Sequence, residues 1–220
     1  MTGGGEPKSI VCFGDSITWG FDPRGAEAFH RYGIAERWTR RLQDELGDGY
    51  HVVEEGLSGR TTVFDDPVLG GMSGLADLPN VLKSHMPVDL LVLMLGTNDI
   101  KNRFGVNGAE IATAMSRLVD LALKSGCGPD AGPPQILLLV PPVLGPVDQT
   151  WLAPMFGDEK NRVVLEELRQ TYPALAAVFG IACFDTNEAV KPGTIDGVHL
   201  DPDMLEPFAK AVAAQICVLL

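Results

Sequence analysis

The sequence has few basic residues: 17 lysines and arginines stand against 29 aspartates and glutamates, which gives a formal net charge of -12 at pH 7. A surface of this sign repels phosphate backbones and anionic lipid headgroups. We therefore expect no nucleic-acid partner, no anionic membrane surface as a partner and no polyanionic substrate.

Histidine and cysteine are also scarce, with four of each. The cysteines form no C-x-x-C pair, so buried, reduced thiols are the expectation, although a disulfide between two of them stays open. His30, His51 and His85 fit no metal-ligand spacing, and the Asp-Asp-Pro stretch at 65–67 is typical of a turn. The sequence predicts no metal and no cofactor.

Long apolar runs are missing as well. No segment has the ~18 consecutive apolar residues that span a bilayer, and the start of the chain does not read as a secretory signal peptide. We therefore expect no membrane partner and a cytoplasmic location. Residues 1–7 are expected to be a flexible N-terminus, and residues 8–220 a single domain, because no linker separates two periodic halves.

Five short apolar segments predict five strands. The third and fourth contain the runs LLVLML and ILLLV, which are typical of strands buried on both faces of a parallel sheet. Helical patterns lie between the strands, and such alternation predicts right-handed β-α-β units. We therefore expect an α/β fold, a three-layer α/β/α sandwich around a parallel five-stranded sheet. The expected strands are 9–13, 51–55, 90–95, 135–140 and 181–184, and the expected helices are 35–46, 108–124, 160–178 and one that reaches the end of the chain.

Prolines mark the weaker helix boundaries. Pro173 predicts a break in the third helix, because proline removes a backbone donor and clashes with the preceding turn. Asp201 is typical of a helix N-cap, while Pro207 indicates that the last helix restarts nearby. The stretch 60–87 is rich in glycine and proline and predicts only a short helix at about 75–83.

Four fragments carry candidate chemistry, and three of them follow predicted strands, where open α/β sheets bind their ligands. Each fragment taken alone also fits a purely structural role, as a helix N-cap, a glycine turn or an Asx-turn. The fragments are GDSITWG with Ser16, GLSGR with Gly56 and Gly59, GTND with Asn98, and DGVH with Asp196 and His199.

Together the four fragments fit acyl transfer, which needs a nucleophile, a base, an orienting carboxylate and donors for an oxyanion. Ser16 is the predicted nucleophile and His199 the predicted base. Asp196 precedes His199 by three residues and can hold its Nδ1, which leaves the other nitrogen for the serine. The predicted oxyanion donors are the N–H groups of Ser16 and Gly59 and the side-chain amide of Asn98.

These blocks resemble those of the SGNH (GDSL) hydrolases, in the family's order and over nearly the whole chain. The stretches VCFGDSITWG, VVEEGLSGRTT, LMLGTND and IDGVHL resemble the bacterial arylesterase and acyltransferase subgroup. The resemblance implies a flavodoxin-like sheet with strand order 2-1-3-4-5, no metal, and small acyl esters as substrates. It assigns the same triad and oxyanion residues, with Gly56 as a rival for the position given to Gly59. No G-x-S-x-G pentapeptide is present, which argues against an ordinary α/β-hydrolase.

Apolar residues near these blocks are candidates for the substrate pocket, with the core or a subunit contact as the alternative. Asp15 is expected to hold the local backbone by hydrogen bonds. The predicted pocket residues are Ile17, Trp19, Phe156 and Val198, and further candidates in the loops after the first and fourth strands are Phe21, Trp151 and Met155.

The leading prediction is a serine esterase that hydrolyses short-chain acyl esters, aryl esters among them, and that also transfers acyl groups to alcohols or peroxide. A carbohydrate acetyl esterase would need a more polar cleft, and a thioesterase or lysophospholipase a deeper groove. A flavodoxin-like binding module would need a phosphate-cradling loop after the first strand. The long apolar loops 19–32 and 142–157 predict a homo-oligomer, as the resemblance also implies.

Overall fold

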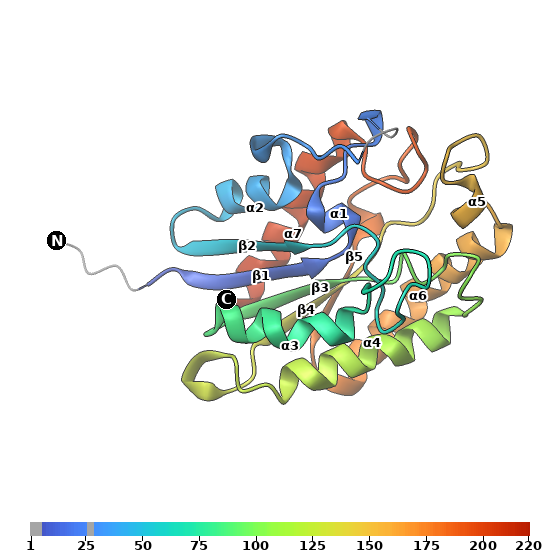
Figure 1. Cartoon of the computed structure of the whole chain (residues 1–220). Helices are drawn as coiled ribbons and strands as arrows, with labels where there is room; N and C mark the ends of the chain where they lie inside the picture. The colour runs from blue at the N-terminus through green and yellow to red at the C-terminus, as the bar shows by residue number, and fades with distance from the viewer. Residues whose placement is uncertain (1–5, 26–28) are drawn as a thin grey trace.

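Five parallel strands form one sheet in the order β2-β1-β3-β4-β5 (Figure 1). The computed structural model describes residues 6–25 and 29–220, so residues 1–5 of the predicted flexible N-terminus lie outside the described residues. All five predicted strands and their order are confirmed. The strands are β1 Lys8–Gly14, β2 Tyr50–Gly56, β3 Leu90–Met94, β4 Gln135–Val140 and β5 Ala182–Asp185.

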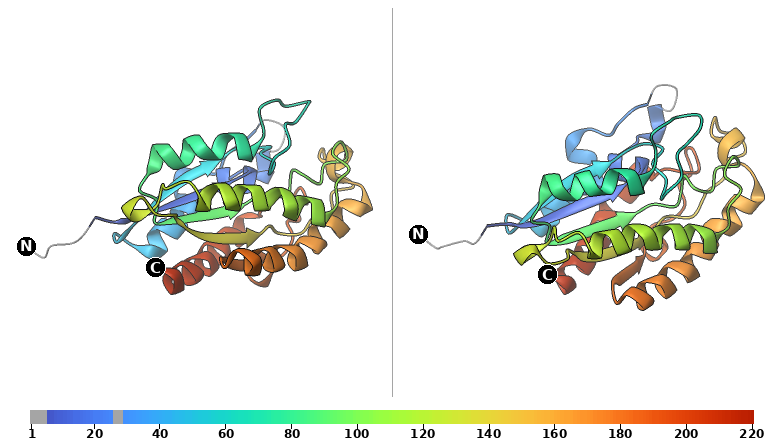
Figure 2. Two further views of the ribbon diagram at one scale, coloured as in Figure 1. Left: turned by 90° about the horizontal axis from the view of Figure 1, so that it is seen from below. Right: turned by 60° about the horizontal axis from the view of Figure 1, so that its bottom comes forward.

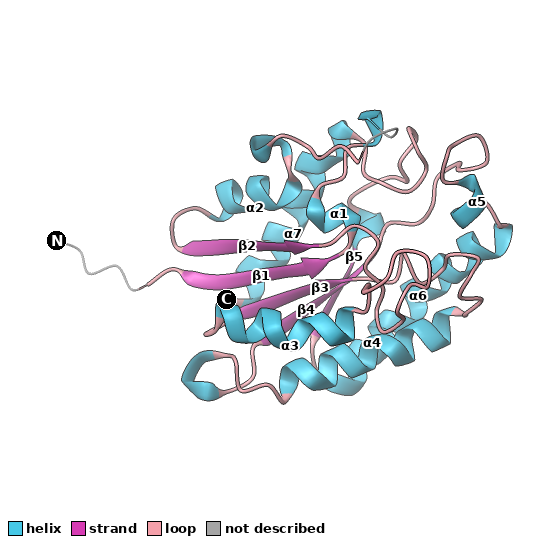
Figure 3. Cartoon of the chain, in the orientation of Figure 1, coloured by secondary structure: helices cyan, strands magenta, loops and turns pink. Residues whose placement is uncertain are grey.

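Helices cover both faces of the sheet, which confirms the three-layer α/β architecture (Figure 2). Helices α3, α4 and α6 pack on one face, and α2 and α7 pack on the other. The helices are α1 Ser16–Trp19, α2 Trp38–Leu46, α3 Gly74–His85, α4 Gly108–Leu123, α5 Ala153–Phe156, α6 Glu159–Phe179 and α7 Leu205–Leu219. Figure 3 shows the longer loops gathered at the carboxyl ends of the strands, where the candidate residues lie.

The alternation of side chains explains the unbroken apolar runs. In β3, Leu91 and Leu93 face the core under α3, α4 and α6, whereas Leu90 and Val92 face the core under α2 and α7. All four side chains are fully buried or nearly so. Because successive side chains of a strand point to opposite faces, a strand covered on both sides must be apolar at every position.

The break predicted at Pro173 is wrong, because α6 runs through it. Pro173 is exposed, so water can reach the carbonyl group that the proline leaves without a partner. The preceding residue, Tyr172, is fully buried, and its hydroxyl donates to the carbonyl oxygen of Leu95 at 2.9 Å. Packing of this face outweighs a local cost of about 3 kcal/mol.

The other helix boundaries differ by a few residues. Helix α2 begins at Trp38, and the residues before it form a 3-10 turn, Ile34–Glu36. The restart near Pro207 is confirmed, since a 3-10 turn, Pro202–Met204, precedes α7. Within residues 6–25 and 29–220, no helix combines the length and the apolar character needed to cross a membrane.

Candidate active site

Three predicted residues meet at the carboxyl edge of the sheet. Nε2 of His199 lies 2.9 Å from Oγ of Ser16, and its Nδ1 lies 2.6 Å from Oδ2 of Asp196. Ser16 is the first residue of α1, two residues after the end of β1, and the other two lie in the loop that precedes α7. The carboxylate favours the tautomer with a proton on Nδ1, so the lone pair of Nε2 faces the hydroxyl.

Backbone bonds shape the loop that carries the imidazole. Oδ1 of Asp196 accepts from the N–H groups of Val198 and His199, both at 2.9 Å, while Gly197, between Asp196 and Val198, adopts a φ of 78°. Burial raises the pKa of the Asp196 carboxyl, but the hydrogen bonds and charge of His199 and the two backbone donors outweigh it and hold that pKa below its ordinary value. The carboxylate therefore stays ionised beside the imidazole.

A second carboxylate closes the same loop. The carboxylate of Asp201 accepts from the N–H groups of Thr194 at 2.8 Å and Ile195 at 3.2 Å. Asp201 does stand at the N-cap position of the following 3-10 turn, as predicted, but its side chain binds this loop instead of capping that turn. The hydroxyl of Tyr32 donates to the carbonyl oxygen of Leu200 at 2.9 Å and fixes the loop from the other side.

The serine stands on a tight strand-to-helix turn. Asp15 is the N-cap of α1, and its Oδ1 accepts from the N–H of Ile17 at 3.0 Å, which confirms its predicted backbone role. Its Oδ2 has no hydrogen-bond partner among the described residues. Burial raises the pKa of Asp15 to about 6, against the lowering influence of the Ile17 N–H and of nearby positive charges.

The two candidate glycines occupy different environments. Gly59 adopts a φ of 95° and lines the cavity beside Ser16. A Cβ on Gly56 would lie 2.0 Å from the backbone nitrogen of Trp19, so Gly56 allows the first helix to pack on β2. The geometry therefore favours Gly59 over Gly56 as the residue with an N–H available to a bound ester.

Asn98 follows β3 and completes the set of donors. Its Nδ2 donates to the carbonyl oxygen of Arg60 at 3.1 Å, which uses one of its two hydrogens and orients the amide. Ser16, Gly59 and Asn98 line the same cavity as His199. The candidate donors, two backbone N–H groups and one side-chain amide, therefore belong to residues that line the cavity beside the Ser16 hydroxyl.

The cavity beside the serine is small, at about 170 Å³, and largely apolar. Phe156 and Val198 line it, whereas Ile17 and Trp19 lie outside its lining. Ile17 packs in the core under α2 and α7, and the Trp19 ring lies against Arg31. The other apolar lining residues are Phe21, Phe29, Leu69, Trp151, Leu152 and Met155.

A wider, open hollow of about 860 Å³ shares Phe29 and Trp151 with this cavity. Its wall is more polar and includes Arg24, Gln149 and Thr150. Among the described residues, no group of three or more histidines, cysteines and acidic residues is placed to hold a metal ion. The four cysteines are free.

Comparison with known proteins agrees with this geometry. The profile of the GDSL-like lipase/acylhydrolase family matches residues 12–205. The chain belongs to this family of esterases. A carbohydrate acetylesterase from Sinorhizobium meliloti is 38% identical, with a TM-score of 0.91 over 97% of this chain and 100% of that one. The aryl esterase of M. smegmatis is also 38% identical, with a TM-score of 0.90 over the same shares of the two chains.

An acetylxylan esterase from Xylanibacter ruminicola is 28% identical over 94% of this chain. The esterase described here spans only 42% of the length of that relative. One of these relatives is therefore named for aryl esters, and the other two are named for acetylated carbohydrates.

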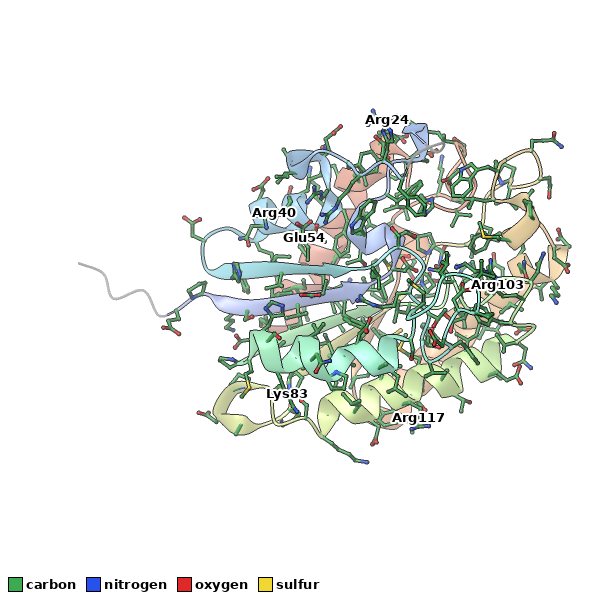
Figure 4. The ribbon with its side chains drawn as sticks, in the orientation of Figure 1. Arg24, Arg40, Glu54, Lys83, Arg103 and Arg117 are labelled. Carbon is green, nitrogen blue, oxygen red and sulfur yellow. The ribbon has the colours of Figure 1, made fainter. Side chains whose placement is uncertain are left out.

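Sequence reasoning missed a buried ion-pair cluster in this esterase. Asp66 forms the predicted turn by accepting from the N–H of Val68 at 2.9 Å, but it is also fully buried and pairs with two cations. Nζ of Lys101 lies 3.3 Å and Nη1 of Arg103 lies 2.8 Å from its carboxylate oxygens. Lys101 lines the cavity. Figure 4 labels Arg103 near the loops at the carboxyl ends of the strands. Asp66 and Lys101 are 35 positions apart, and no local pattern in the sequence indicates that they are in contact.

Proposed function

We propose that this chain is a serine esterase that hydrolyses short-chain acyl esters through an acyl-enzyme on Ser16. The observation that carries the proposal is the connected hydrogen-bond chain from Ser16 Oγ through His199 to Asp196, which faces a cavity lined by candidate donors. A nucleophile, a base and an orienting carboxylate in this order are the requirements of acyl transfer.

In the first half-reaction, Oγ of Ser16 attacks the ester carbonyl carbon while Nε2 of His199 takes the hydroxyl proton. The carbonyl π electrons move to the oxygen, and the N–H groups of Ser16 and Gly59 with the Asn98 amide bind the resulting oxyanion. The intermediate then collapses, the ester C–O bond breaks, and the imidazolium gives its proton to the departing alcohol or phenol oxygen.

In the second half-reaction, water attacks the acyl-enzyme as His199 takes one of its protons. The C–O bond to Ser16 breaks, the serine oxygen recovers the proton, and the carboxylic acid leaves. The same site can pass the acyl group to an alcohol or to peroxide where that nucleophile, rather than water, reaches the carbonyl carbon. The apolar lining supports transfer to apolar alcohols, because it favours their binding over that of water.

The size of the cavity supports small substrates. An apolar cavity of about 150 Å³ is known to admit benzene, so the 170 Å³ beside Ser16 suits a short acyl group and one aromatic ring more than a long acyl chain. Acetate and similar esters of phenols or benzylic alcohols are the substrate class that we propose.

A second candidate is an acetyl ester of a carbohydrate. The wider hollow favours it, because Arg24, Gln149 and Thr150 offer hydrogen bonds and Trp151 offers a flat apolar face. One relative is named a carbohydrate acetylesterase and another an acetylxylan esterase, which supports the same substrate class.

Rates on p-nitrophenyl esters of increasing acyl length, measured beside acetylated xylo-oligosaccharides, separate the two candidates. We expect kcat/KM to fall beyond short acyl chains and to be higher for the aryl esters. Ser16→Ala should lower kcat on the order of a million-fold by analogy with other triads, with an unchanged circular dichroism spectrum. Retention of more than about a tenth of the activity on p-nitrophenyl acetate would overturn the mechanism.

We also propose that the chain forms a homo-oligomer around this opening. Large apolar side chains are exposed beside the cavity and hollow: Phe29 is 68% exposed, Trp151 46% and Ile195 43%. Burial of such a patch against a second copy is favourable. Light scattering after size exclusion tests the assembly, and a monomer would refute it. Product analysis with vinyl acetate and benzyl alcohol tests the transfer, and acetic acid as sole product would refute that.

A further inference from the structure

An aromatic ring lies flat against the catalytic imidazole. The ring of Phe21 stacks on that of His199 with 4.0 Å between centroids and 20° between planes. Phe21 is 3% exposed and follows α1 on the chain. Asp196 and Ser16 contact two edges of the imidazole through hydrogen bonds, and the Phe21 ring covers one of its faces.

The backbone of Phe21 is tied to the nucleophile. Its N–H donates to the carbonyl oxygen of Ser16 at 2.9 Å, and the N–H of Tyr32 donates to the carbonyl oxygen of Gly20 at 2.8 Å. The three groups therefore form a closed circuit: Ser16 holds the backbone of Phe21, the Phe21 ring covers His199, and the imidazole returns to the serine hydroxyl. A shift of the aromatic ring would move the base relative to the nucleophile.

Neighbouring aromatic rings hold the side chain in place. The centroids of Phe29, Trp151 and Trp19 lie 6.2, 6.3 and 6.4 Å from that of Phe21. Contact on several sides restricts the ring to one orientation, and the ring in turn opposes rotation of the imidazole out of its plane. Nδ1 then stays on Asp196 and Nε2 stays on Ser16 through the catalytic cycle.

The stack also has an electrostatic consequence. The face of a phenyl ring carries partial negative charge and attracts a cation within about 6 Å of its centroid. His199 is neutral while it waits for the proton of Ser16 and becomes a cation as that proton arrives. The attraction is therefore stronger in the transition state than in the substrate complex, which is the condition for raising kcat without lowering KM.

We propose that Phe21 is a positioning residue that fixes the plane of the His199 imidazole and stabilises the imidazolium formed when Ser16 attacks. The proposal rests on the proposed esterase mechanism. It differs from a role as cavity wall, because a wall residue would act on substrate binding and a positioning residue acts on the chemical step.

The test keeps the shape of the ring and changes its charge distribution. Phenylalanines with one, three and five fluorines are incorporated at position 21, because fluorination progressively removes the negative charge from the ring face. We expect kcat on p-nitrophenyl acetate to fall stepwise, reaching about 10-fold with five fluorines, while KM changes less than about twofold. Phe21→Leu, which keeps apolar bulk and has no ring, should lose at least as much.

The matched control is the same pentafluoro substitution at Phe104. Its ring pairs with Phe64 at 5.5 Å and lies outside the cavity lining, so kcat should not change. A kcat that stays constant across the series at position 21, a change in KM alone, or an equal loss at Phe104 would each overturn the proposal. The activity of Ser16→Ala separates failure of the esterase mechanism from failure of the role of Phe21. If Ser16→Ala is inactive and kcat is constant across the fluorinated variants at position 21, the esterase mechanism stands and only the role of Phe21 fails.

Discussion

Removal of the Asn98 amide tests the oxyanion assignment most directly. In Asn98→Ala, one donor to the developing negative charge is lost, and a single such donor typically stabilises the transition state by about 3–4 kcal/mol. We therefore expect kcat on p-nitrophenyl acetate to fall ~10²-fold or more. KM should change little, because the ester carbonyl oxygen carries less charge before the attack than after it.

The same substitution has a structural cost that must be separated from the catalytic one. It removes the hydrogen bond from Nδ2 to the carbonyl oxygen of Arg60 and leaves that acceptor unpaired, which should cost about 1 kcal/mol of unfolding free energy. Asn187 provides a matched control, because its Nδ2 donates to the carbonyl oxygen of Pro141 at 3.1 Å outside the cavity lining. Asn187→Ala should lose at least as much stability, because its side chain also accepts from the N–H of Val143 at 2.8 Å and donates to Asp185 at 2.7 Å, and it should keep its kcat.

Initial rates over a range of ester concentrations give kcat and KM separately, and thermal unfolding of both variants gives the stability term. A rise in KM with kcat unchanged would identify Asn98 as a ground-state binding residue and refute the oxyanion role. An equal loss of kcat in both variants would show that the effect is structural.

Three further predictions concern pH and buried charge. kcat/KM should fall as the pH is lowered, because Nε2 of His199 must be free to take a proton from Ser16; a rate that does not fall on acidification would contradict this. Burial raises the pKa of Asp99 to about 6 from its ordinary value of 3.8, although Thr62 donates to it. The native state therefore binds this proton more tightly than the unfolded state does, and stability falls as the pH rises from about 4 to 6. Relative to wild type, Asp99→Asn should then gain roughly 1 kcal/mol of unfolding free energy between pH 5 and 7 in denaturant titrations, and an equal difference at both pH values would count against it. Lys101→Met removes one of two cations from the buried carboxylate of Asp66 and should cost about 3 kcal/mol in the same titrations, whereas a neutral result would mean that Arg103 alone compensates the charge.

The sheet could be predicted from the sequence because its signal is local. The runs LLVLM in β3 and ILLLV in β4 are short and apolar on both faces, which is typical of strands covered on both sides. The positions of Ser16 and Asn98 followed from the same reasoning, since each lies just after a strand and all parallel strands end at one edge.

The features that could not be predicted depend on contacts between distant segments. No residue near Pro173 in the sequence indicates that Tyr172 will be buried and will donate to Leu95, just after β3, so the local rule for proline gave the wrong result. Side-chain direction posed the same problem at α1: Ile17 and Trp19 neighbour the nucleophile, yet their side chains lie outside the cavity lining, while Phe21 reaches the imidazole. The backbone after α1 therefore places Phe21, and not Ile17 or Trp19, in the lining of the cavity.

The position of the imidazole along the chain affects when the site can exist. His199 lies 183 residues after the serine that it contacts, in the loop directly before α7. A ribosome therefore completes the sheet strands before it has made the base, and α7, which packs against α2, is made after the base. Until the loop that carries His199 lies beside Ser16, the serine has no base and reacts with esters only as an ordinary alcohol does. The appearance of ester turnover thus reports the docking of the His199 loop beside Ser16, and it can be used to time that step of folding.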